Sequence, residues 1–429
     1  MGLDISGRAS TKKPADKTLQ RIADYFNETY GDDLVREATL VEDGRGLLVS
    51  FAMTSDPIAF EAVGKSAIEV QCRWNHLGPG YCIFAWERLR ALESIGLVWE
   101  ELDAETGEPG TPTHNGAIKA IRTWMSALCQ AVSRDAPPDA SGVGLCMPMN
   151  WVPLQPQFAS TPMGPRDRAW VDRVANDGAA GDDFFAWWNP DLGAATKLQL
   201  ARAAMWNSVP WAPPAVQDDF TAMAMTLDWL ERAYEEDGGL AYPWPEWAEI
   251  IRNFNIALDQ IPGQHERPAN AGMIEDRAAG KPGTIGYRRA DIDHRIGGGW
   301  SLTLPGSFGT DYEEEEDHAA WLASDGTMTI RVSPARAPDE MPDSKEAFAE
   351  ATREPEAAGV EWASDSCIGR GDWGEDDSEG QPVHMLQGIS MADGRRVAFV
   401  TIMFDDPADR HRALATWHAL RCDDFGESD

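Results

Sequence analysis

The chain of 429 residues carries 71 acidic and 37 basic side chains, a formal net charge of −34, and 43% of its residues are hydrophobic. This length and composition are typical of two or three globular domains with sizeable cores. The negative charge argues against nucleic-acid binding, because phosphate backbones are repelled, and no apolar run approaches the ~20 residues that span a membrane.

The first part of the chain predicts an α+β domain that follows a short polar tail. We expect residues 1–16 to form a disordered tail and residues 17–136 to form the domain. The apolar spacing predicts a helix, a hairpin with its turn near Asp43-Gly44, a third strand, a helix, a fourth strand and a last helix. Asn115 is available to cap that last helix.

Residues 137–261 predict a helical region, rich in tryptophan, that packs on this domain. Four successive segments have an apolar stripe at helical spacing and are separated by Pro and Gly. We expect the clustered tryptophans to fill the core where short helices meet, and a protein-binding surface is the alternative. Residues 262–283 are rich in Pro, Gly, Ala and charge and have no sustained period, which predicts a linker.

Residues 284–422 predict a second, acidic α+β domain. Six segments have the hydrophobic period of strands, one helix interrupts them at 344–359, and another closes the chain at 406–421. We expect an antiparallel sheet whose one face the two helices can cover. From Asp291 onward the chain has 31 acidic and 11 basic residues, a net charge of −20. Adaptation to salt is an alternative origin of this bias.

The densest acidic run is DYEEEED, residues 311–317, which we expect to form a hairpin loop between two strands. A solvated loop, a contact for a basic partner and a cation site are the three interpretations. The run lacks the spacers and the glycine of a calcium loop, which argues against a metal site. The residues predicted to bind a partner are Glu313, Glu314, Glu315, Glu316 and Asp317 of this run, with Asp376 and Asp377 of a later acidic run.

Short catalytic signatures are missing from the sequence. It contains no HExxH, GxSxG, GxxxxGK[ST] or CxxC pattern, so we expect no metal and no cofactor. The six cysteines form no close pair, which predicts reduced thiols. No secretory leader pattern opens the chain, and we therefore expect a cytoplasmic location.

One cluster has the composition of a catalytic site. The segment CRWNHLGPGY lies between a predicted strand and a predicted helix, a position at which catalytic groups often occur. Its candidate catalytic residues are Arg73, Asn75, His76 and Tyr81. The structural alternative is a capped helix start with a tight Gly-Pro-Gly turn.

Several motifs carry a resemblance to known proteins. GPRDRAW, DDFFAWWNPDL and YPWPEW resemble a family of uncharacterised bacterial proteins over most of residues 40–261. WSLTLPGSF and MTIRVSPA are similar to small standalone bacterial domains, and the strand–helix order around them resembles the PsbP-like α/β/α sandwich. The resemblance implies a C-terminal sandwich and transfers no catalytic residues.

Two functions remain open. The first is a non-enzymatic interaction protein, of the immunity or antitoxin type, whose acidic surface captures a basic protein partner. The alternative is an enzyme whose site is centred on His76, which requires a pocket where Arg73, Asn75 and Tyr81 converge on that histidine. We favour the first, because the charge gradient and the missing signatures both indicate recognition.

Overall fold

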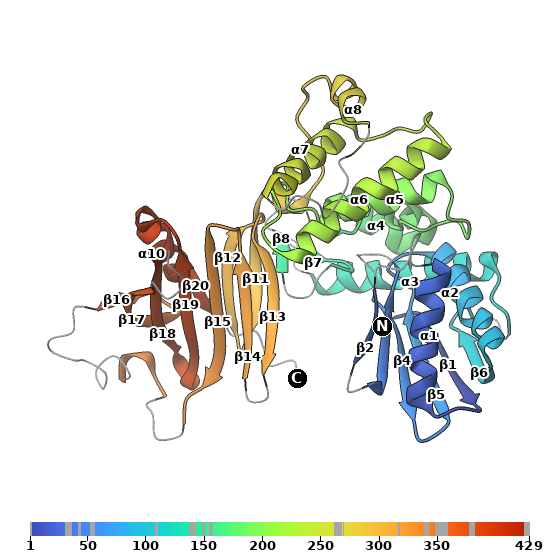
Figure 1. Cartoon of the computed structure of the whole chain (residues 1–429), viewed down its shortest axis with the longest axis horizontal. Helices are drawn as coiled ribbons and strands as arrows, with labels where there is room; N and C mark the ends of the chain where they lie inside the picture. The colour runs from blue at the N-terminus through green and yellow to red at the C-terminus, as the bar shows by residue number, and fades with distance from the viewer. Residues whose placement is uncertain are drawn as a thin grey trace.

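The fold is taken from a computed structural model of the chain (Figure 1). It describes residues 2–30, 37–41, 44–51, 56–107, 110–136, 143–147, 151–153, 158–260, 268, 270–315, 318–338, 343–347, 359–376 and 382–423. Within these residues the protein is a mixed α+β structure whose strands form four sheets with mainly antiparallel pairing. The predicted α+β class is confirmed at this level.

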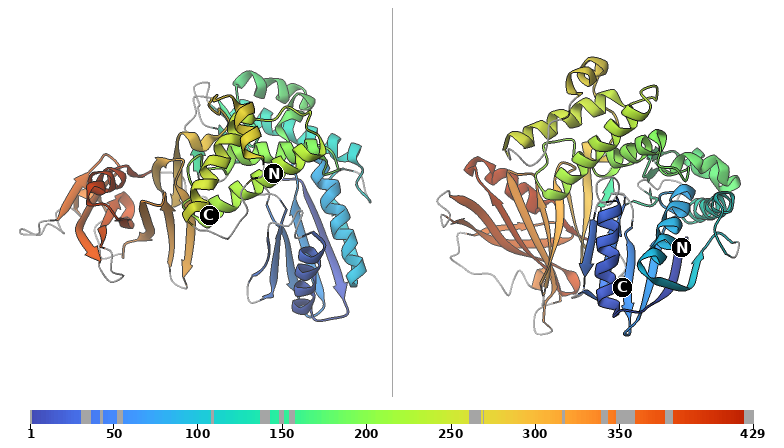
Figure 2. Two further views of the ribbon diagram at one scale, coloured as in Figure 1. Left: turned by 45° about the horizontal axis from the view of Figure 1, so that its top comes forward. Right: turned by 45° about the vertical axis from the view of Figure 1, so that its right-hand side comes forward.

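The N-terminal sheet has its described strands in the order β2-β3-β4-β5-β1-β6. Helix α1 packs on β2, β3 and β4 with an apolar stripe that includes Leu19, Ile22 and Phe26, all fully buried. Figures 1 and 2 show α1 and α2 against one face of the sheet. The elements are β1 (Asp4–Thr11), α1 (Ala15–Tyr30), β2 (Glu37–Val41), β3 (Gly46–Ser50), β4 (Ile58–Val63), β5 (Ala67–Arg73), α2 (Pro79–Ala91), β6 (Leu97–Ala104) and α3 (His114–Asp135).

The prediction of a disordered tail at residues 1–16 is wrong, because β1 lies between β5 and β6 inside the sheet. Only Ile5 and Ala9 of this strand are buried, while Ser6 and Arg8 face the open side. A strand with so few apolar positions gives no alternating hydrophobic signal, which explains the error. Strand β4 was also missing from the prediction, whereas the β2–β3 hairpin is confirmed.

The cap predicted for α3 is wrong as well. Thr113 occupies the N-cap position, and its hydroxyl accepts a hydrogen bond from the main-chain N–H of Gly116 at 3.0 Å. Asn115 already lies inside the helix. Threonine and asparagine are both good caps, so the sequence left the first turn open to a shift of two residues.

The middle of the chain forms a helical layer that shares the N-terminal core. Its four predicted helices are confirmed, and Trp187 and Trp247 are fully buried there, as expected for core tryptophans. The predicted linker at 262–283 contains a helix, α8. The elements are β7 (Val143–Gly144), β8 (Trp151–Pro153), β9 (Ala159–Thr161), β10 (Gly164–Arg166), α4 (Arg168–Asn176), α5 (Ala194–Asn207), α6 (Gln217–Glu236), α7 (Trp244–Gln260) and α8 (Ala271–Ala278).

Two sheets form the C-terminal part, and a second core that includes α10 lies between them. The long sheet has its described strands in the order β13-β14-β15-β19-β18-β17-β16, and the short sheet has the order β20-β12-β11-β8. The elements are β11 (Asp291–Gly297), β12 (Trp300–Pro305), β13 (Gly309–Glu315), β14 (His318–Ser324), β15 (Met328–Arg336), β16 (Val360–Ala363), β17 (Cys367–Asp376), β18 (Val383–Ala392), β19 (Arg396–Phe404), α10 (Arg410–His418) and β20 (Leu420–Cys422).

Three further sequence predictions concern the C-terminal part and the strand that joins it. The acidic run is not simply a loop, because its first five residues belong to β13 and pair with β14. Strand β8, from the region predicted to be helical, pairs with β11 and so ties the helical layer to the C-terminal part. Most of the helix predicted at 344–359 lies outside the described residues.

Candidate functional site

The four predicted catalytic residues are neighbours in the fold, and three of them are buried. The Asn75 side-chain carbonyl accepts a hydrogen bond from the main-chain N–H of Leu3 at 3.1 Å, which holds the start of β1. His76 Nε2 accepts from the main-chain N–H of Asp56 at 3.1 Å. Tyr81 is fully buried, with its ring centroid 5.4 Å from that of Trp187. The three buried side chains are therefore engaged in packing and main-chain hydrogen bonds.

Arg73 and the local electrostatics agree with that interpretation. The Arg73 side chain is half exposed and makes ion pairs with Asp4 at 3.7 Å and with Asp56 at 3.3 Å. Burial lowers the pKa of His76 to about 4, so the ring is neutral at physiological pH. A neutral histidine whose Nε2 already accepts a main-chain hydrogen bond is poorly placed to act as a general base.

The start of α2 shows the tight turn of the structural alternative. Gly78 has a φ of 123°, a conformation that favours glycine, and no side chain caps the helix at this position. A Cβ atom on Gly80 would lie 2.1 Å from the carbonyl oxygen of Asn189. The glycines therefore permit the 187–189 segment to pack directly on the helix start.

The predicted partner-binding residues lie in or beside edge positions of the long sheet. Strand β13 is at one end of its described strand order, where Asp311 and Glu313 are exposed and Tyr312 is 44% exposed. Glu313 also pairs with Arg331 at 3.3 Å. The side chains of Glu314, Glu315 and Asp376, and the whole of residues Glu316, Asp317 and Asp377, lie outside the described residues.

A second acidic surface is the face of the N-terminal sheet that α1 and α2 leave open. It is hollowed, with a volume of about 590 Å³. Four exposed carboxylates and one arginine line the hollow: Glu61, Glu69, Glu101, Asp103 and Arg8. Arg8 is 3.1 Å from Glu69, so its charge is partly compensated within the hollow. The sequence prediction missed this surface because it assigned β1 to a tail.

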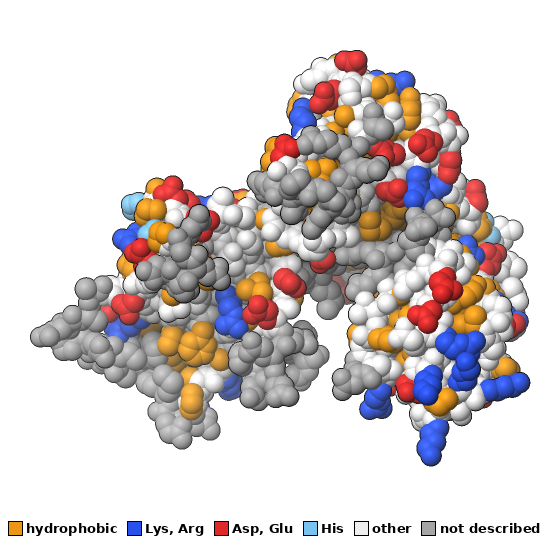
Figure 3. All heavy atoms as spheres, in the orientation of Figure 1, with side chains coloured by type: hydrophobic (Ala, Val, Ile, Leu, Met, Phe, Trp, Pro, Cys, Tyr) orange, Lys and Arg blue, Asp and Glu red, His pale blue; other side chains and the backbone are white. Residues whose placement is uncertain are grey.

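The surface charge is uneven. Figure 3 shows Lys and Arg side chains gathered at the lower end of the N-terminal part, while Asp and Glu are spread over the rest of this face. Lys12, Lys13, Arg45 and Lys65 line a hollow beside the start of α1. The described surface therefore has a basic tip despite the chain's net charge.

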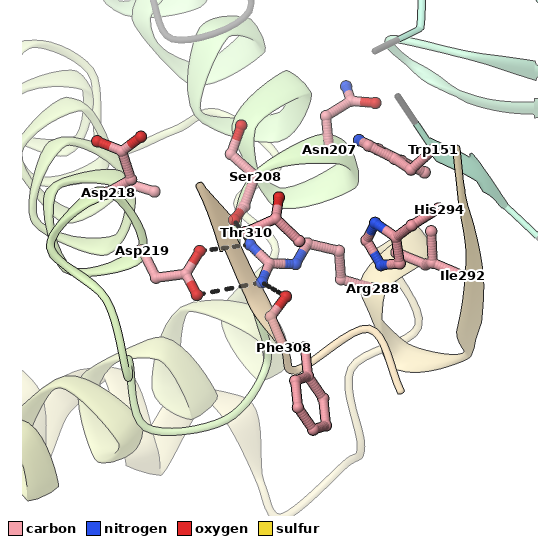
Figure 4. Close-up of a pocket in the computed structure, with 11 residues that line it drawn as sticks. Trp151, Asn207, Ser208, Asp218, Asp219, Arg288, Ile292, His294, Phe308 and Thr310 are labelled. Carbon is pink, nitrogen blue, oxygen red and sulfur yellow. Dashed lines mark hydrogen bonds and ion pairs between the residues drawn. The ribbon is translucent and has the colours of Figure 1, made fainter. Parts of the chain in front are cut away.

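A third site is a partly open cavity of about 210 Å³ where the helical layer meets the C-terminal sheets (Figure 4). Its walls come from the end of α5, the start of α6, strands β8, β11 and β13, and the turn after β12. Its lining includes Trp151, Asn207, Asp219, Arg288, Ile292 and His294.

Arg288 is the fixed centre of this cavity wall. It forms a bidentate ion pair with Asp219, at 2.6 and 3.1 Å, and both side chains are almost fully buried. It also donates to the carbonyl oxygens of Ser208 at 2.7 Å, Gly306 at 2.7 Å and Phe308 at 2.9 Å. All five N–H donors of the guanidinium are thus used within the protein.

His294 lies beside Arg288 on the cavity wall, as Figure 4 shows, and is only 3% exposed. Among the described residues, neither of its ring nitrogens has a hydrogen-bond partner. Burial, with a smaller effect of the Arg288 charge, lowers its pKa to about 4, so the ring is neutral. The His294 ring also packs near Trp321, with ring centroids 5.5 Å apart.

Asn207, a second residue of the cavity lining, adds a third polar atom without a partner among the described residues. Its amide nitrogen donates to the carbonyl oxygens of Pro162 at 3.0 Å and Ala203 at 2.9 Å, which fixes the orientation of the amide. Its side-chain oxygen has no hydrogen-bond partner within the described part of the chain. Buried polar atoms are normally paired, but unpaired ones also occur elsewhere among the described residues, for example His76 Nδ1 and Trp187 Nε1.

The sequence prediction missed the whole cavity. Its residues come from five separate stretches of the chain, and Arg288 and Asp219 alone are 69 positions apart. The one signal in the sequence is the basic pair Arg288-Arg289 at the start of the acidic C-terminal region. Two adjacent arginines indicate neither the carboxylate with which one of them pairs nor the presence of a cavity.

No group of three His, Cys, Asp or Glu side chains that could hold a metal ion occurs among the described residues. None of the helices that the structure describes is both long and apolar enough to cross a membrane. No protein-family model matches the chain, and no curated protein matches it. Function therefore has to be inferred from the geometry and charge of the chain itself.

Proposed function

We propose that this protein is a non-enzymatic, cytoplasmic interaction protein of the immunity or antitoxin type, which binds a basic protein partner through acidic surface. The observation that carries the proposal is the acidic strand β13, at one end of the described long sheet. Asp311 and Glu313 are exposed on one face of this strand, and the half-exposed ring of Tyr312 points to the opposite face.

An acidic edge strand suits a basic partner for two reasons. An extended segment of the partner can add to the sheet edge through main-chain hydrogen bonds, while Lys and Arg side chains meet the carboxylates. An exposed aromatic ring can supply the apolar anchor that interfaces commonly have. Charged side chains on an edge strand also hinder self-association, which is the competing explanation for their presence.

The open face of the N-terminal sheet supports the same class of partner. Its hollow has an excess of carboxylates over basic side chains and is large enough to receive a protruding loop. The basic tip at the other surface shows that the anionic charge is not a uniform coat. A uniform coat would have favoured adaptation to salt over docking.

We do not extend the proposal to an enzyme centred on His76. Asn75, His76 and Tyr81 are occupied by packing and by main-chain hydrogen bonds, so no observation favours that function. For the fold, we propose that residues 284–422 form a PsbP-like sandwich and that the chain is related to the bacterial family that its motifs resemble. The packing of α10 on the long sheet supports the helix-on-sheet part of that arrangement, while the short sheet in the same core departs from an α/β/α order.

The experiment captures basic proteins from the host lysate on the immobilised chain, at salt concentrations from ~0.1 M to ~1 M. The electrostatic screening length falls from about 10 Å to about 3 Å over that range, so capture should weaken strongly. Asp311→Lys with Glu313→Lys should abolish capture if the partner uses β13. Glu61→Lys with Glu101→Lys should abolish it if the partner uses the sheet face.

A matched control separates local charge from net charge. Glu87→Lys with Glu93→Lys changes the net charge by the same amount on exposed positions of the α2 region. This control should retain capture. Two results would contradict a specific acidic docking surface: capture that does not depend on salt, and an equal loss of capture in all three double variants.

A further inference from the structure

We propose that the open face of the N-terminal sheet is the docking surface for a basic amphipathic helix of a protein partner. This inference rests on the proposed function and adds which acidic surface receives the partner and in which conformation. The carrying observation is the face itself. Helices α1 and α2 cover the other side of the sheet, while this side has a partly open hollow of about 590 Å³.

The strand register places a row of charged side chains across this face. Glu61 of β4 lies opposite Glu69 of β5, Glu69 lies opposite Arg8 of β1, and Arg8 lies opposite Glu101 of β6. All four residues are exposed and line the hollow. Residues that are directly opposite on adjacent strands point to the same face, so the row is continuous and mostly negative.

The negative charge of the row is only partly compensated. Glu61 and Glu69 are opposite each other on antiparallel strands, where like charges are destabilising. Arg8 lies 3.1 Å from Glu69 and 3.6 Å from Glu100. Glu61 and Glu101 make no ion pair with another described residue. A face that served only solubility would carry interspersed charges of both signs, so the excess of carboxylates indicates a cationic occupant.

Apolar side chains lie on the same face beside the charged row. Leu48 and Ala59 are opposite each other on β3 and β4, and both line the hollow. Val98 of β6 lies opposite Ser10 of β1, which shares the face of Arg8, and Val98 is 58% exposed. An occupant that matches this face therefore has to offer apolar as well as cationic side chains.

The conformation of the occupant follows from hydrogen bonding. The main-chain groups of a sheet pair within the sheet, so its face offers side chains only, and an extended segment lying on it would leave its own main-chain groups unpaired. A helix pairs these groups internally and presents an apolar stripe with flanking charges. Six described strands ~4.8 Å apart make a sheet about 24 Å wide, which is the length of a helix of about 16 residues.

Other classes of occupant match the face less well. The phosphate groups of nucleic acids and of anionic lipids would be repelled by its carboxylates. Within the part of the chain that the structure describes, these carboxylates do not form a group that could hold a metal ion. The edge strand β13 differs from this face, because an edge offers main-chain groups and so suits an extended segment.

The test uses three fluorescently labelled peptides of about 16 residues. The first has Leu, Lys and Ala at helical spacing. The second replaces two central alanines by proline, which breaks the helix and keeps the charge, and the third replaces every lysine by glutamate. Binding to the full-length protein is measured by fluorescence anisotropy at ~0.15 M salt, where long-range attraction is screened. We expect the first peptide to bind and the other two to bind at least tenfold more weakly.

Variants of the protein locate the binding. Glu61→Lys with Glu101→Lys should weaken binding of the first peptide at least tenfold, and Glu61→Gln with Glu101→Gln should weaken it less. Val98→Ser should weaken it by about threefold, because apolar contact is lost. Glu87→Lys with Glu93→Lys changes the net charge equally in the α2 region and should leave binding unchanged. Far-UV circular dichroism checks that each variant is folded.

The inference is overturned if the proline peptide binds as tightly as the first, if the variants at Glu61 and Glu101 bind normally, or if the α2-region control loses binding equally. Capture from lysate that depends on Asp311 and Glu313 alone would also overturn it and would leave the proposed function standing. Peptide binding as expected, with no basic protein captured from lysate, would count against the proposed function only. Peptide binding that is lost in Glu61→Lys with Glu101→Lys and kept in the α2-region control supports the inference.

Discussion

His76 in the N-terminal part and His294 at the C-terminal junction are alike in burial and different in hydrogen bonding. Burial lowers the pKa of each ring to about 4, and each has a buried asparagine in the same part of the fold. Near His76, the acceptors of both residues are used by main-chain N–H groups. Near His294, neither ring nitrogen nor the oxygen of Asn207 has a partner in the described chain.

The difference separates a histidine that holds the fold through a main-chain hydrogen bond from one that is buried without a hydrogen bond among the described residues. A histidine between a strand and a helix matched the expected position of a catalytic residue, yet its hydrogen bonds are structural. A histidine in the middle of a strand gave no sequence signal, yet it lines a cavity with its nitrogens unused. His76 makes one hydrogen bond to the main chain and leaves its Nδ1 without a partner among the described residues, whereas His294 makes none there, so the two rings differ by a single hydrogen bond.

The largest expected effect comes from breaking the buried ion pair between Arg288 and Asp219, which lies beside His294. Arg288→Met should lower the free energy of unfolding by about 3–5 kcal/mol, because it leaves the buried Asp219 carboxylate unpaired. Chemical denaturation followed by far-UV circular dichroism measures the change. Arg289→Met is the matched control, since the Arg289–Glu249 pair is more exposed and its loss should cost clearly less.

The next effect is shared by both histidines and depends on pH. In the unfolded chain a histidine has a pKa of about 6.5, whereas both folded rings have a pKa of about 4. The contribution of these rings to the free energy of unfolding is therefore complete above pH ~6.5 and falls as the pH is lowered to ~4. The reason is that both histidines bind protons in the unfolded state over this range but stay neutral in the folded state. The loss should approach about 3 kcal/mol for each histidine.

Denaturation midpoints measured between pH 7 and pH 4 test this expectation. A double variant, His76→Phe with His294→Phe, should have a flatter profile over that range, since it lacks both titrating rings. The carboxylates titrate in both proteins and cancel in the difference. An identical slope for the parent and the double variant would show that these rings do not control the pH dependence.

Much of the fold could be predicted from the period of apolar residues. Helices such as α6 carry a continuous stripe, with Phe220, Met223 and Leu230 all buried, and these were found. Strand β1 was missed because one of its faces is open and polar, and β8 was missed because it has only three residues. Periodicity identifies elements that bury one regular face, and short or sparsely apolar strands fall below that signal.

The sites could be predicted only in part, for a different physical reason. Composition located the acidic run, since charge is a local property of the sequence. Composition did not indicate that the run lies in an edge strand. The cavity depends on which segments meet, and residues as far apart as Trp151 and His294 become partners only through the β8–β11 pairing. No spacing rule within one segment contains that information.

The smallest expected effect is the difference in unfolding free energy between single substitutions of the two histidines. His76→Phe removes the acceptor of the Asp56 N–H and leaves that donor unpaired, so it should cost about 1–3 kcal/mol at pH 7.5. His294→Phe removes two nitrogens that have no partner in the described chain, so its cost should be under about 1 kcal/mol and can become a gain. Both rings are replaced by one of similar volume, and packing is therefore matched. Equal losses in the two variants, measured in one denaturation series, would mean that His294 does have a structural partner and that the contrast between the two regions fails.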